Sequence, residues 1–404
     1  MITNVREPRN LSPTLPPPRH DAVFVFYGVT WDGAIDRGMM FPEERLALEL
    51  MRHPDIGRLL VADCYRSRAA ALVRRARGIG DGFPVRDDLI HVSPLRMRRT
   101  DPTSLRRLRR ASARYTDTLA RAAADSGLTR PAVVVCNPLV AAFGDFSWAG
   151  MRTYYGWDCW AAHYGEAARH EAYVESYRRL HEDGWRVAAV TQPIIDRIGP
   201  TAAARVVPNG VTPEEWRDVP DPPAWYAALP GPRLLYVGSL DRRLDVAAVQ
   251  AAARRFPGGS VVLIGVNYDP AHLAPLADEA NVHVVPPVPR EQIPAITMAS
   301  DAVLVPHMRT ALTESMSPLK LYEGLAGGRP VIATDLAPMR GIDDRVVLVD
   351  DTEDFADAVE AGLRLGAASE DRRLAFVEEH SWRRRFDGLI DLAVDGLAGS
   401  ADVG

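Results

Sequence analysis

Short apolar runs rich in valine alternate with longer stretches of helical periodicity along most of the chain. This alternation is typical of βαβ units and predicts parallel sheets whose strands are buried on both faces. A first set of runs covers residues 21–28, 58–64, 89–94, 132–137, 152–158, 186–191 and 205–208. A second set covers residues 233–240, 260–266, 282–288, 301–307, 330–335 and 345–349. The pattern therefore predicts two doubly wound α/β domains.

A proline-rich stretch separates the two sets of runs. Residues 213–232 contain many prolines, a composition that suits an interdomain linker. We therefore expect one domain over residues 21–212 and another over residues 233–380. Residues 1–20, which are also rich in proline, are expected to be a disordered leader. A helix at residues 381–398 is expected to return to the first domain.

Composition excludes some classes of protein. The chain is 47% hydrophobic and 25% charged, as is ordinary for a globular protein, and its net charge of −5 gives no general reason to bind nucleic acid. The three cysteines, Cys64, Cys136 and Cys159, are odd in number and show no metal-binding spacing, which favours a reducing, cytoplasmic compartment. No apolar run is long enough to predict a membrane span, which takes about 18 residues.

Lys320 is the only lysine among the 48 lysine and arginine residues. Lysine and arginine do not substitute freely where geometry matters, so this position is a candidate for chemistry. A serine and a proline at 317–318 and two glycines at 327–328 predict a short helix over residues 318–326. A cation in its first turn opposes the helix dipole unless an anion such as phosphate binds there. The alternative is a plain ion pair with Glu323, three residues further on.

Four segments, in this order and spacing, resemble the donor half of the family-4-type glycosyltransferases of the GT-B fold. They are residues 208–211 (PNGV), 235–240 (LYVGSL), 299–306 (ASDAVLVP) and 317–334 (SPLKLYEGLAGGRPVIAT). The resemblance is specific over roughly residues 205–350 and weak in the amino-terminal half. It implies two Rossmann-like domains facing one another across a cleft, with a nucleotide-sugar donor bound by the second domain. It also implies retention of configuration at the anomeric carbon.

The resemblance assigns donor-binding roles around the predicted helix. Glu323 takes the place of the glutamate that binds the ribose hydroxyls, and backbone amides such as those of Ser317 and Leu319 would hold the diphosphate. The family usually has a second glutamate eight residues earlier, which touches the sugar. Here that position is Ser315, and Glu314 is one residue away. Pro318 has no N–H, so Lys320 is expected to supply what the proline removes.

A second group of donor-binding residues follows the strand that ends at Gly238. The family places an arginine directly after this glycine, whereas this chain has Ser239. We therefore expect Arg242 and Arg243 to bind the diphosphate, with a solvated turn as the alternative. No Asp-x-Asp triplet occurs in the sequence, so fixed cations rather than a metal are expected to stabilise the leaving group. No cofactor beyond the donor substrate is expected.

Candidates in the amino-terminal half follow the ends of two predicted strands. The loop that carries Gly28, Trp31 and Asp32 is expected to line the cleft, unless it is a plain connecting loop. Asp158 and His163 are the catalytic candidates, because an acid or imidazole there can orient an acceptor hydroxyl. A helix cap and a structural histidine are the alternatives. Trp157 and Trp160, like the tryptophan of the first loop, can stack on a sugar or belong to the core.

Residues 96–114 contain eight arginines and one acid, with apolar residues at helical spacing beneath them. This basic amphipathic segment is either a solvated helix face or a contact with an anionic membrane surface or an anionic acceptor. Nucleic acid is not an expected partner, because no aromatic residues alternate with the arginines.

The sequence as a whole predicts a metal-independent, retaining glycosyltransferase. It would transfer a sugar from a nucleoside diphosphate sugar to a hydroxyl of an unidentified acceptor. Two alternatives remain open: a nucleotide-sugar epimerase of the same fold, and a non-catalytic protein that binds a nucleotide sugar or a membrane. The replacement of the usual glutamate by Ser315 keeps the second alternative in view.

Overall fold

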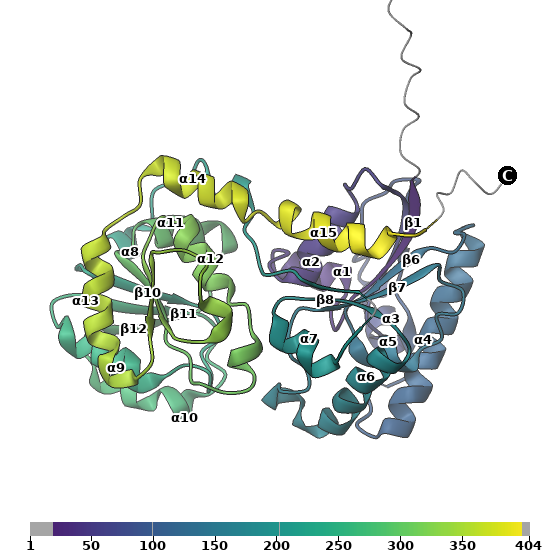
Figure 1. Cartoon of the computed structure of the whole chain (residues 1–404), viewed down its shortest axis with the longest axis horizontal. Helices are drawn as coiled ribbons and strands as arrows, with labels where there is room; N and C mark the ends of the chain where they lie inside the picture. The colour runs from purple at the N-terminus through teal and green to yellow at the C-terminus, as the bar shows by residue number, and fades with distance from the viewer. Residues whose placement is uncertain (1–18, 99, 202, 398–404) are drawn as a thin grey trace, which may run out of the picture.

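The computed structural model describes residues 19–98, 100–201 and 203–397. Two α/β domains lie side by side, and the chain passes back from the second to the first near its carboxyl end (Figure 1). Residues 1–18 of the expected leader lie outside the described residues. Within the described part of the chain, no helix has the length and apolar character needed to cross a membrane.

The first domain is built on a sheet of seven parallel strands in the order β4-β2-β1-β6-β7-β8-β9. The strands are β1 (His20–Val25), β2 (Ile56–Ala62), β4 (Leu89–Val92), β6 (Ala132–Val135), β7 (Met151–Gly156), β8 (Arg186–Ala189) and β9 (Ala204–Val206). Each of the apolar runs predicted for this half overlaps one of them. The central strand β1 reads as a continuous apolar run because helices cover both of its faces.

The second domain has six parallel strands in the order β12-β11-β10-β13-β14-β15. The strands are β10 (Arg233–Val237), β11 (Ser260–Ile264), β12 (Val282–Val285), β13 (Ala302–Val305), β14 (Val331–Thr334) and β15 (Val346–Val349). In each sheet the strand order reverses beside the first strand, at β1 and at β10. Ligands of open parallel sheets bind beyond the carboxyl ends of the strands at such a point. The loops after β1 and β10 are therefore the natural place for a site.

Helices cover both sheets. The first domain contains α1 (Trp31–Asp36), α2 (Pro42–Leu50), α3 (Arg68–Ala76), α4 (Leu105–Asp125), α5 (Pro138–Phe143), α6 (His170–Glu182) and α7 (Gln192–Ile198). The second contains α8 (Ala224–Ala227), α9 (Val246–Arg255), α10 (Pro270–Leu273), α11 (Ile293–Met298), α12 (Leu319–Ala326) and α13 (Phe355–Leu365). Short 3₁₀ turns that matter below are η1 (Tyr164–Arg169), η2 (Pro213–Trp216) and η4 (Arg290–Gln292).

The last two helices return the chain to the first domain. Helices α14 (Glu370–Glu379) and α15 (Trp382–Val394) run from the second domain over to the first (Figure 1). Trp382, Phe386 and Leu389 of α15 are buried in the hydrophobic core of the first domain. The helix predicted at residues 381–398 therefore packs on the amino-terminal half, although it is encoded after the second domain.

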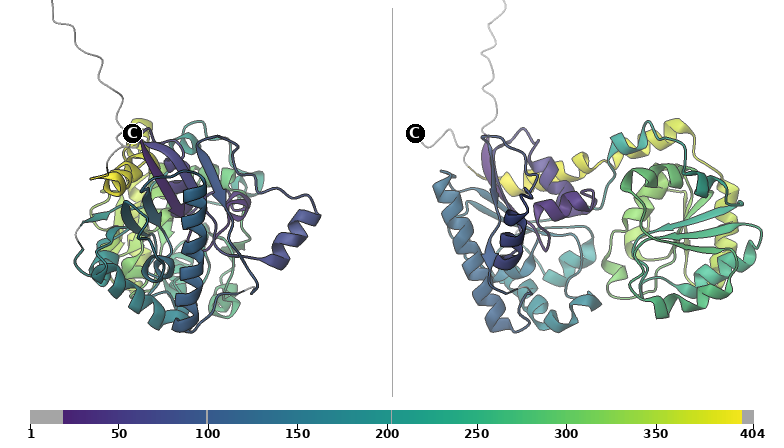
Figure 2. Two further views of the ribbon diagram at one scale, coloured as in Figure 1. Left: turned by 90° about the vertical axis from the view of Figure 1, so that its right-hand side faces the viewer. Right: turned by 180° about the vertical axis from the view of Figure 1, so that it is seen from behind.

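A small arm extends from the first domain. It consists of α3 and a two-stranded parallel pair, β3 (Arg66–Ser67) and β5 (Leu95–Arg96). None of the residues of α3 is buried, and the helix stands away from the body of the domain (Figure 2, left view). The sequence did not reveal this arm, because its short strands carry no apolar pattern.

The loop before α12 belongs to the second domain but packs against the first. Leu312 lies within the hydrophobic core of the first domain, and Met316 and Leu319 pack against that core. The Thr191 hydroxyl donates to the carbonyl oxygen of Ser315, 2.7 Å away. Apolar and polar contacts with the first domain therefore hold the loop that leads into α12.

We expect Gly265→Ala to lower the free energy of unfolding by about 3 kcal/mol, since it combines backbone strain with overpacking. Gly265 has a φ of +157°, and a Cβ atom there would lie 1.9 Å from the carbonyl oxygen of Gly238. The matched control is Gly258→Ala, where a Cβ atom has no neighbour within 4 Å and the change should stay within about 0.5 kcal/mol. Urea denaturation measures both variants, and equal midpoints would contradict the packing described for these strand ends.

Candidate functional site

Lys320 lies in the first turn of α12, at the carboxyl end of the second sheet. Its Nζ atom is 3.3 Å from Nε2 of His307, which follows β13, and 4.7 Å from the ring centroid of Tyr236 in β10. At Gly238, directly after β10, a Cβ atom would lie 3.3 Å from Nζ, so glycine lets the backbone pass close to the ammonium group. An imidazole, an aromatic face and a glycine therefore surround this ammonium group.

No carboxylate forms an ion pair with Lys320 within the described part of the chain. The two nearby acids are already paired: Asp241 with Arg243 and Glu323 with Arg290. Burial lowers the pKa of Lys320 to about 7, and the positive charge of Arg243 acts in the same direction. Near neutral pH the side chain of Lys320 is therefore an ammonium group in only part of the molecules, and that ammonium group lacks a counter-ion.

Arg243 provides a permanent positive charge beside Lys320. Burial disfavours the charged guanidinium, but its hydrogen bonds to both Asp241 oxygens, at 2.9 and 2.6 Å, outweigh burial and raise the pKa of Arg243. Arg242 lies elsewhere: its side chain is 76% exposed and pairs with Asp269 at 2.9 Å. Of the two arginines predicted to bind diphosphate, the structure brings only Arg243 to Lys320.

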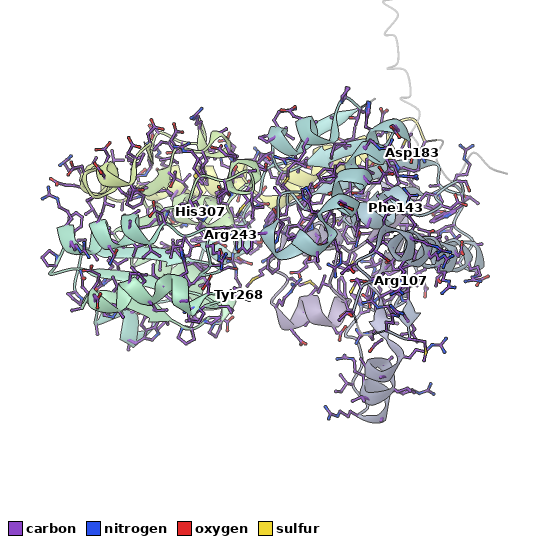
Figure 3. The ribbon with its side chains drawn as sticks, turned by 90° about the horizontal axis from the view of Figure 1, so that it is seen from below. Arg107, Phe143, Asp183, Arg243, Tyr268 and His307 are labelled. Carbon is purple, nitrogen blue, oxygen red and sulfur yellow. The ribbon has the colours of Figure 1, made fainter. Side chains whose placement is uncertain are left out.

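The first domain contributes polar groups to the same place. Burial raises the pKa of Asp158, which follows β7, against the opposing positive charges of His163 and Arg243. Burial and a hydrogen bond to Asp241 raise the pKa of Tyr164 to about 12. Figure 3 shows Arg243 at the edge of the second domain nearest the first. Groups from both domains therefore meet around Arg243.

Glu323 belongs to a chain of charges that crosses between the domains. One oxygen, Oε1, accepts a hydrogen bond from Arg290, and Arg290 Nη2 lies 2.7 Å from Glu215 in η2. The other Glu215 oxygen lies 2.6 Å from Arg45 in α2 of the first domain. Oε2 of Glu323 has no hydrogen-bond partner among residues 19–98, 100–201 and 203–397. The glutamate is thus held in place through one oxygen and keeps the other available.

The start of α12 offers free backbone donors. The prediction that Ser317 caps this helix is wrong, because Pro318 is the N-cap residue and the Ser317 hydroxyl accepts from the Asn209 amide at 3.1 Å. The backbone amides of Leu319 and Lys320 have no acceptor in the described chain. A helix start with unpaired N–H groups and a nearby cation favours an anion.

The family comparison agrees with this arrangement. Residues 231–364 match the family described as glycosyl transferases group 1. The matched segment therefore resembles a group 1 glycosyl transferase domain. It includes Lys320, Glu323, Arg243 and the loop that joins them, so the resemblance found in the sequence is confirmed. No curated protein sequence matches the chain.

Solved glycosyltransferase structures share the fold of the whole chain. Sucrose-phosphate synthase from Thermosynechococcus elongatus has a TM-score of 0.65 at 14% identity and covers 93% of this chain and 98% of its own. The UDP-forming alpha,alpha-trehalose-phosphate synthase from Burkholderia xenovorans has a TM-score of 0.65 at 12% identity, with 93% and 99% coverage. The trehalose-6-phosphate structure from E. coli bound with UDP-2-fluoro glucose has a TM-score of 0.63 at 10% identity, with 94% and 99% coverage. These structures confirm the expected GT-B fold of the chain, and the family match over residues 231–364 supports the expected glycosyltransferase.

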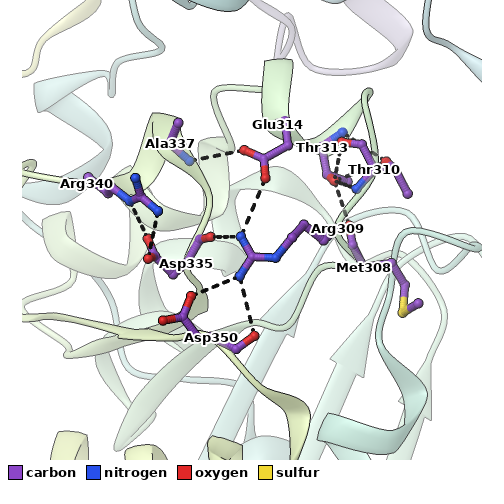
Figure 4. Close-up of polar contacts among 9 residues, drawn as sticks. All are labelled: Met308, Arg309, Thr310, Thr313, Glu314, Asp335, Ala337, Arg340 and Asp350. Atoms are coloured by element: carbon purple, nitrogen blue, oxygen red, sulfur yellow. Dashed lines mark hydrogen bonds and ion pairs between the residues drawn. The ribbon is translucent and has the colours of Figure 1, made fainter.

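The glycosyltransferase domain differs from the usual pattern before α12. The Ser315 hydroxyl donates to the Ala311 carbonyl oxygen at 2.8 Å. Both oxygens of the neighbouring Glu314 are in use, one 3.5 Å from Arg309 and one accepting the amide of Ala337 at 3.3 Å (Figure 4). Neither residue offers a free carboxylate at the position where the family usually has its second glutamate.

Only part of the predicted cleft loop of the first domain is free to contact a ligand. Gly28 is exposed, and a Cβ atom there has no neighbour within 4 Å. Trp31 is instead a core residue whose indole nitrogen donates to the Gly82 carbonyl oxygen at 3.3 Å. Asp32 forms ion pairs with Arg66 and Arg74 of the arm. The structure therefore uses Trp31 and Asp32 to attach the arm and does not bring them to Lys320.

Trp157 and Trp160 pack against Tyr27, which lies two residues after the end of β1. Tyr27 stacks on Trp160 with a centroid distance of 3.6 Å, and Trp157 meets Trp160 edge-on at 4.9 Å. Trp160 is buried and Trp157 is half-buried. The two tryptophans thus pack chiefly on other aromatic side chains of the first domain.

Glu215→Gln should lower the free energy of unfolding by about 2 kcal/mol at pH 7, the range for hydrogen bonds to charged groups. The charges of Arg290 and Arg45 outweigh burial and lower the pKa of Glu215. Its contribution is therefore present above the ordinary glutamate pKa and lost as the pH falls through the lower, folded-state pKa.

The matched control for this variant is Glu378→Gln. Glu378 pairs with Arg217, both side chains are half exposed, and such pairs contribute little, so a change of less than about 0.5 kcal/mol is expected. Chemical denaturation at pH 7 and pH 4 measures both variants. Equal losses of unfolding free energy for Glu215→Gln and Glu378→Gln at pH 7 would show that the chain of charges between the domains adds nothing to stability.

Proposed function

We propose that this chain transfers a sugar from a nucleoside diphosphate sugar to an acceptor hydroxyl, with retention of configuration and without a metal. The observation that carries the proposal is the half-buried ammonium group of Lys320, which has no carboxylate partner in the described chain and lies beside Arg243. Two adjacent cations at a helix start with unpaired amides suit a diphosphate. A leaving diphosphate needs neutralising charge aimed at it, and these cations can supply that charge.

The remaining donor contacts follow from the same geometry. Glu323 is assigned to the ribose, because its free Oε2 can accept from a hydroxyl while Arg290 holds Oε1. The amides of Leu319 and Lys320 are assigned to the diphosphate. The fold relative from E. coli that binds UDP-2-fluoro glucose supports a nucleotide sugar as the donor class.

Asp158 and His163 are assigned to the acceptor side. Asp158 accepts from the Cys159 amide at 2.7 Å through one oxygen, and His163 accepts from the Gly165 amide at 3.1 Å through Nδ1. Each keeps a second polar atom for an acceptor hydroxyl or for the sugar ring. In a same-face displacement the leaving phosphate takes the acceptor proton, so neither residue has to act as the base.

Incubation with UDP-, GDP- and dTDP-sugars tests the reaction. Transfer or slow release of the nucleoside diphosphate, unchanged by EDTA, supports the proposal. NMR of the product then reports its anomeric configuration. Interconversion of the sugar without nucleotide release would indicate an epimerase, and binding without turnover a non-catalytic protein.

Lys320→Ala should weaken binding of a nucleoside diphosphate by about 1.5–3 kcal/mol, the range for a hydrogen bond to a charged group. The control is Arg242→Ala, which also removes a positive charge that follows β10, but one that is exposed, is paired with Asp269 and is not brought to Lys320. It should leave the affinity almost unchanged, because exposed ion pairs contribute little. Isothermal titration calorimetry compares the two variants, and an unchanged affinity for Lys320→Ala would falsify the phosphate role.

We also propose that the arm and the start of α4 contact an anionic membrane surface. Leu72, Val73 and Met97 are exposed apolar side chains in this region. Arg106 and Arg107 at the start of α4 are exposed, and no ion pair is found for them in the described chain; Figure 3 labels Arg107. Exposed apolar side chains among unpaired arginines favour the interface of a membrane that carries anionic lipids.

Leu72→Glu should reduce co-sedimentation with vesicles of phosphatidylglycerol and phosphatidylcholine at least several-fold, because it places a negative charge on the apolar face of α3. Leu365→Glu is the matched control, since Leu365 is also exposed but lies in α13 of the second domain. Equal sedimentation of both variants, or binding that does not depend on phosphatidylglycerol, would contradict the membrane contact.

A further inference from the structure

His307 is the closest polar neighbour of the Lys320 ammonium group. It follows the carboxyl end of β13, its side chain is 2% exposed, and its Nε2 atom lies 3.3 Å from Lys320 Nζ. Its other ring nitrogen, Nδ1, is buried without a hydrogen-bond partner in the described chain. Leaving a buried imidazole nitrogen without a partner costs free energy, which is consistent with a functional role for this side chain.

The His307 ring can keep contact with Lys320 in both charge states of the lysine. Burial, together with the positive charges of Lys320 and Arg243, lowers the pKa of His307 well below its ordinary value, so the imidazole is neutral. When Lys320 is an ammonium group, it donates to the lone pair of Nε2, and Nδ1 carries the ring proton. When Lys320 is a neutral amine, the tautomer with a proton on Nε2 can donate to Nζ.

The other groups around Lys320 favour opposite charge states of its amine. Asp241 and Glu323 favour the ammonium form, but each is already paired with an arginine. Arg243 disfavours that form, and burial disfavours it most. The remaining neighbours are the face of Tyr236 and, from the first domain, Tyr164, which is hydrogen-bonded to Asp241. The charge of Lys320 therefore depends on what enters the cleft.

We propose that His307 is a positioning residue for Lys320, and that the pair takes up one proton from solvent when a nucleoside diphosphate sugar binds. The inference rests on the proposed function, because it requires the diphosphate to approach Lys320. A diphosphate beside the amine favours the ammonium form, and His307 accepts one of its hydrogen bonds. In this step Nζ gains one proton, so an N–H bond forms while water or the buffer acid gives up that proton, and the negative charge of the diphosphate balances the new positive charge.

The direction of the pH dependence follows from the charge of the free site. The pKa of Lys320 is lowered to about 7 in the free chain, so most molecules carry a neutral amine at pH 8 and an ammonium group at pH 6. Binding is therefore expected to take up most of a proton at pH 8 and little at pH 6. The affinity should fall as the pH rises above 7.

Calorimetry in buffers of different ionisation enthalpy measures this proton uptake directly. UDP-glucose, GDP-glucose and dTDP-glucose are the probes, because their diphosphate diesters do not titrate near neutral pH. Uptake at pH 8 that largely disappears at pH 6 supports the inference. Binding at pH 8 without proton uptake overturns it and leaves the proposed function intact, whereas failure of all three probes to bind removes both.

Three variants separate a positioning role from a structural one. Lys320→Arg keeps a cation that does not lose its proton, so uptake should vanish at both pH values. His307→Leu removes the hydrogen-bond acceptor, so the midpoint of the pH profile should move to lower pH and the affinity at pH 7 should fall at least five-fold. His307→Gln restores a polar partner and should recover most of both. A His307→Leu profile that matches the unsubstituted chain would overturn the positioning role.

Unfolding midpoints show whether each variant is folded. If His307→Leu fails to fold, the comparison of Lys320→Arg with the unsubstituted chain still decides the proton uptake. In that case His307→Ala, which also removes the hydrogen-bond acceptor, decides the positioning role: a pH profile shifted to lower pH supports it, and an unchanged affinity at every pH, with no change in proton uptake, contradicts it.

Discussion

Placing an ammonium group in a partly buried site without a counter-ion costs free energy, and this chain does so at the half-buried Lys320. Its nearest acids, Asp241 and Glu323, are committed to Arg243 and Arg290, so neither can neutralise it. The cost is partly avoided by loss of the proton, which is why the pKa of Lys320 falls to about 7. A bound diphosphate removes the same cost in another way, by supplying the missing charge. The unpaired lysine therefore both destabilises the empty site and favours its ligand.

The rest of the structure keeps this site assembled from two domains. The loop before α12 packs its apolar residues into the core of the first domain, and α15 returns from the second domain to the same core. The chain of charges from Arg45 through Glu215 and Arg290 ends on Glu323, which it orients without using its second oxygen. Asp158 and Tyr164 reach Arg243 and Asp241 from the opposite side. A site whose halves come from different domains depends on these contacts as much as on its own side chains.

The sequence predicted the sheets well and the site only in part. Continuous valine-rich runs identify buried parallel strands because the whole run must be apolar, and each predicted run overlaps a strand. The helix with Lys320 and Glu323 was predicted because a proline marks its start and two glycines mark its end. Arg242 and Arg243 could not be told apart, since only the fold shows that one pairs with Asp269 and the other with Asp241. His307 was missed although it follows a predicted strand, and Trp31 and Asp32 were assigned to the cleft because the arm they support has no sequence pattern.

The single lysine of this chain allows a direct measurement of the central claim. Protein labelled with ¹³C and ¹⁵N only in lysine gives one side-chain signal, that of Lys320, and its chemical shift can be followed against pH by NMR. The account predicts a midpoint near pH 7 in the free chain and a clear rise of that midpoint when UDP-glucose or another nucleotide sugar binds. A midpoint near that of an ordinary exposed lysine, at about 10.4, that does not move with any nucleotide sugar would contradict it.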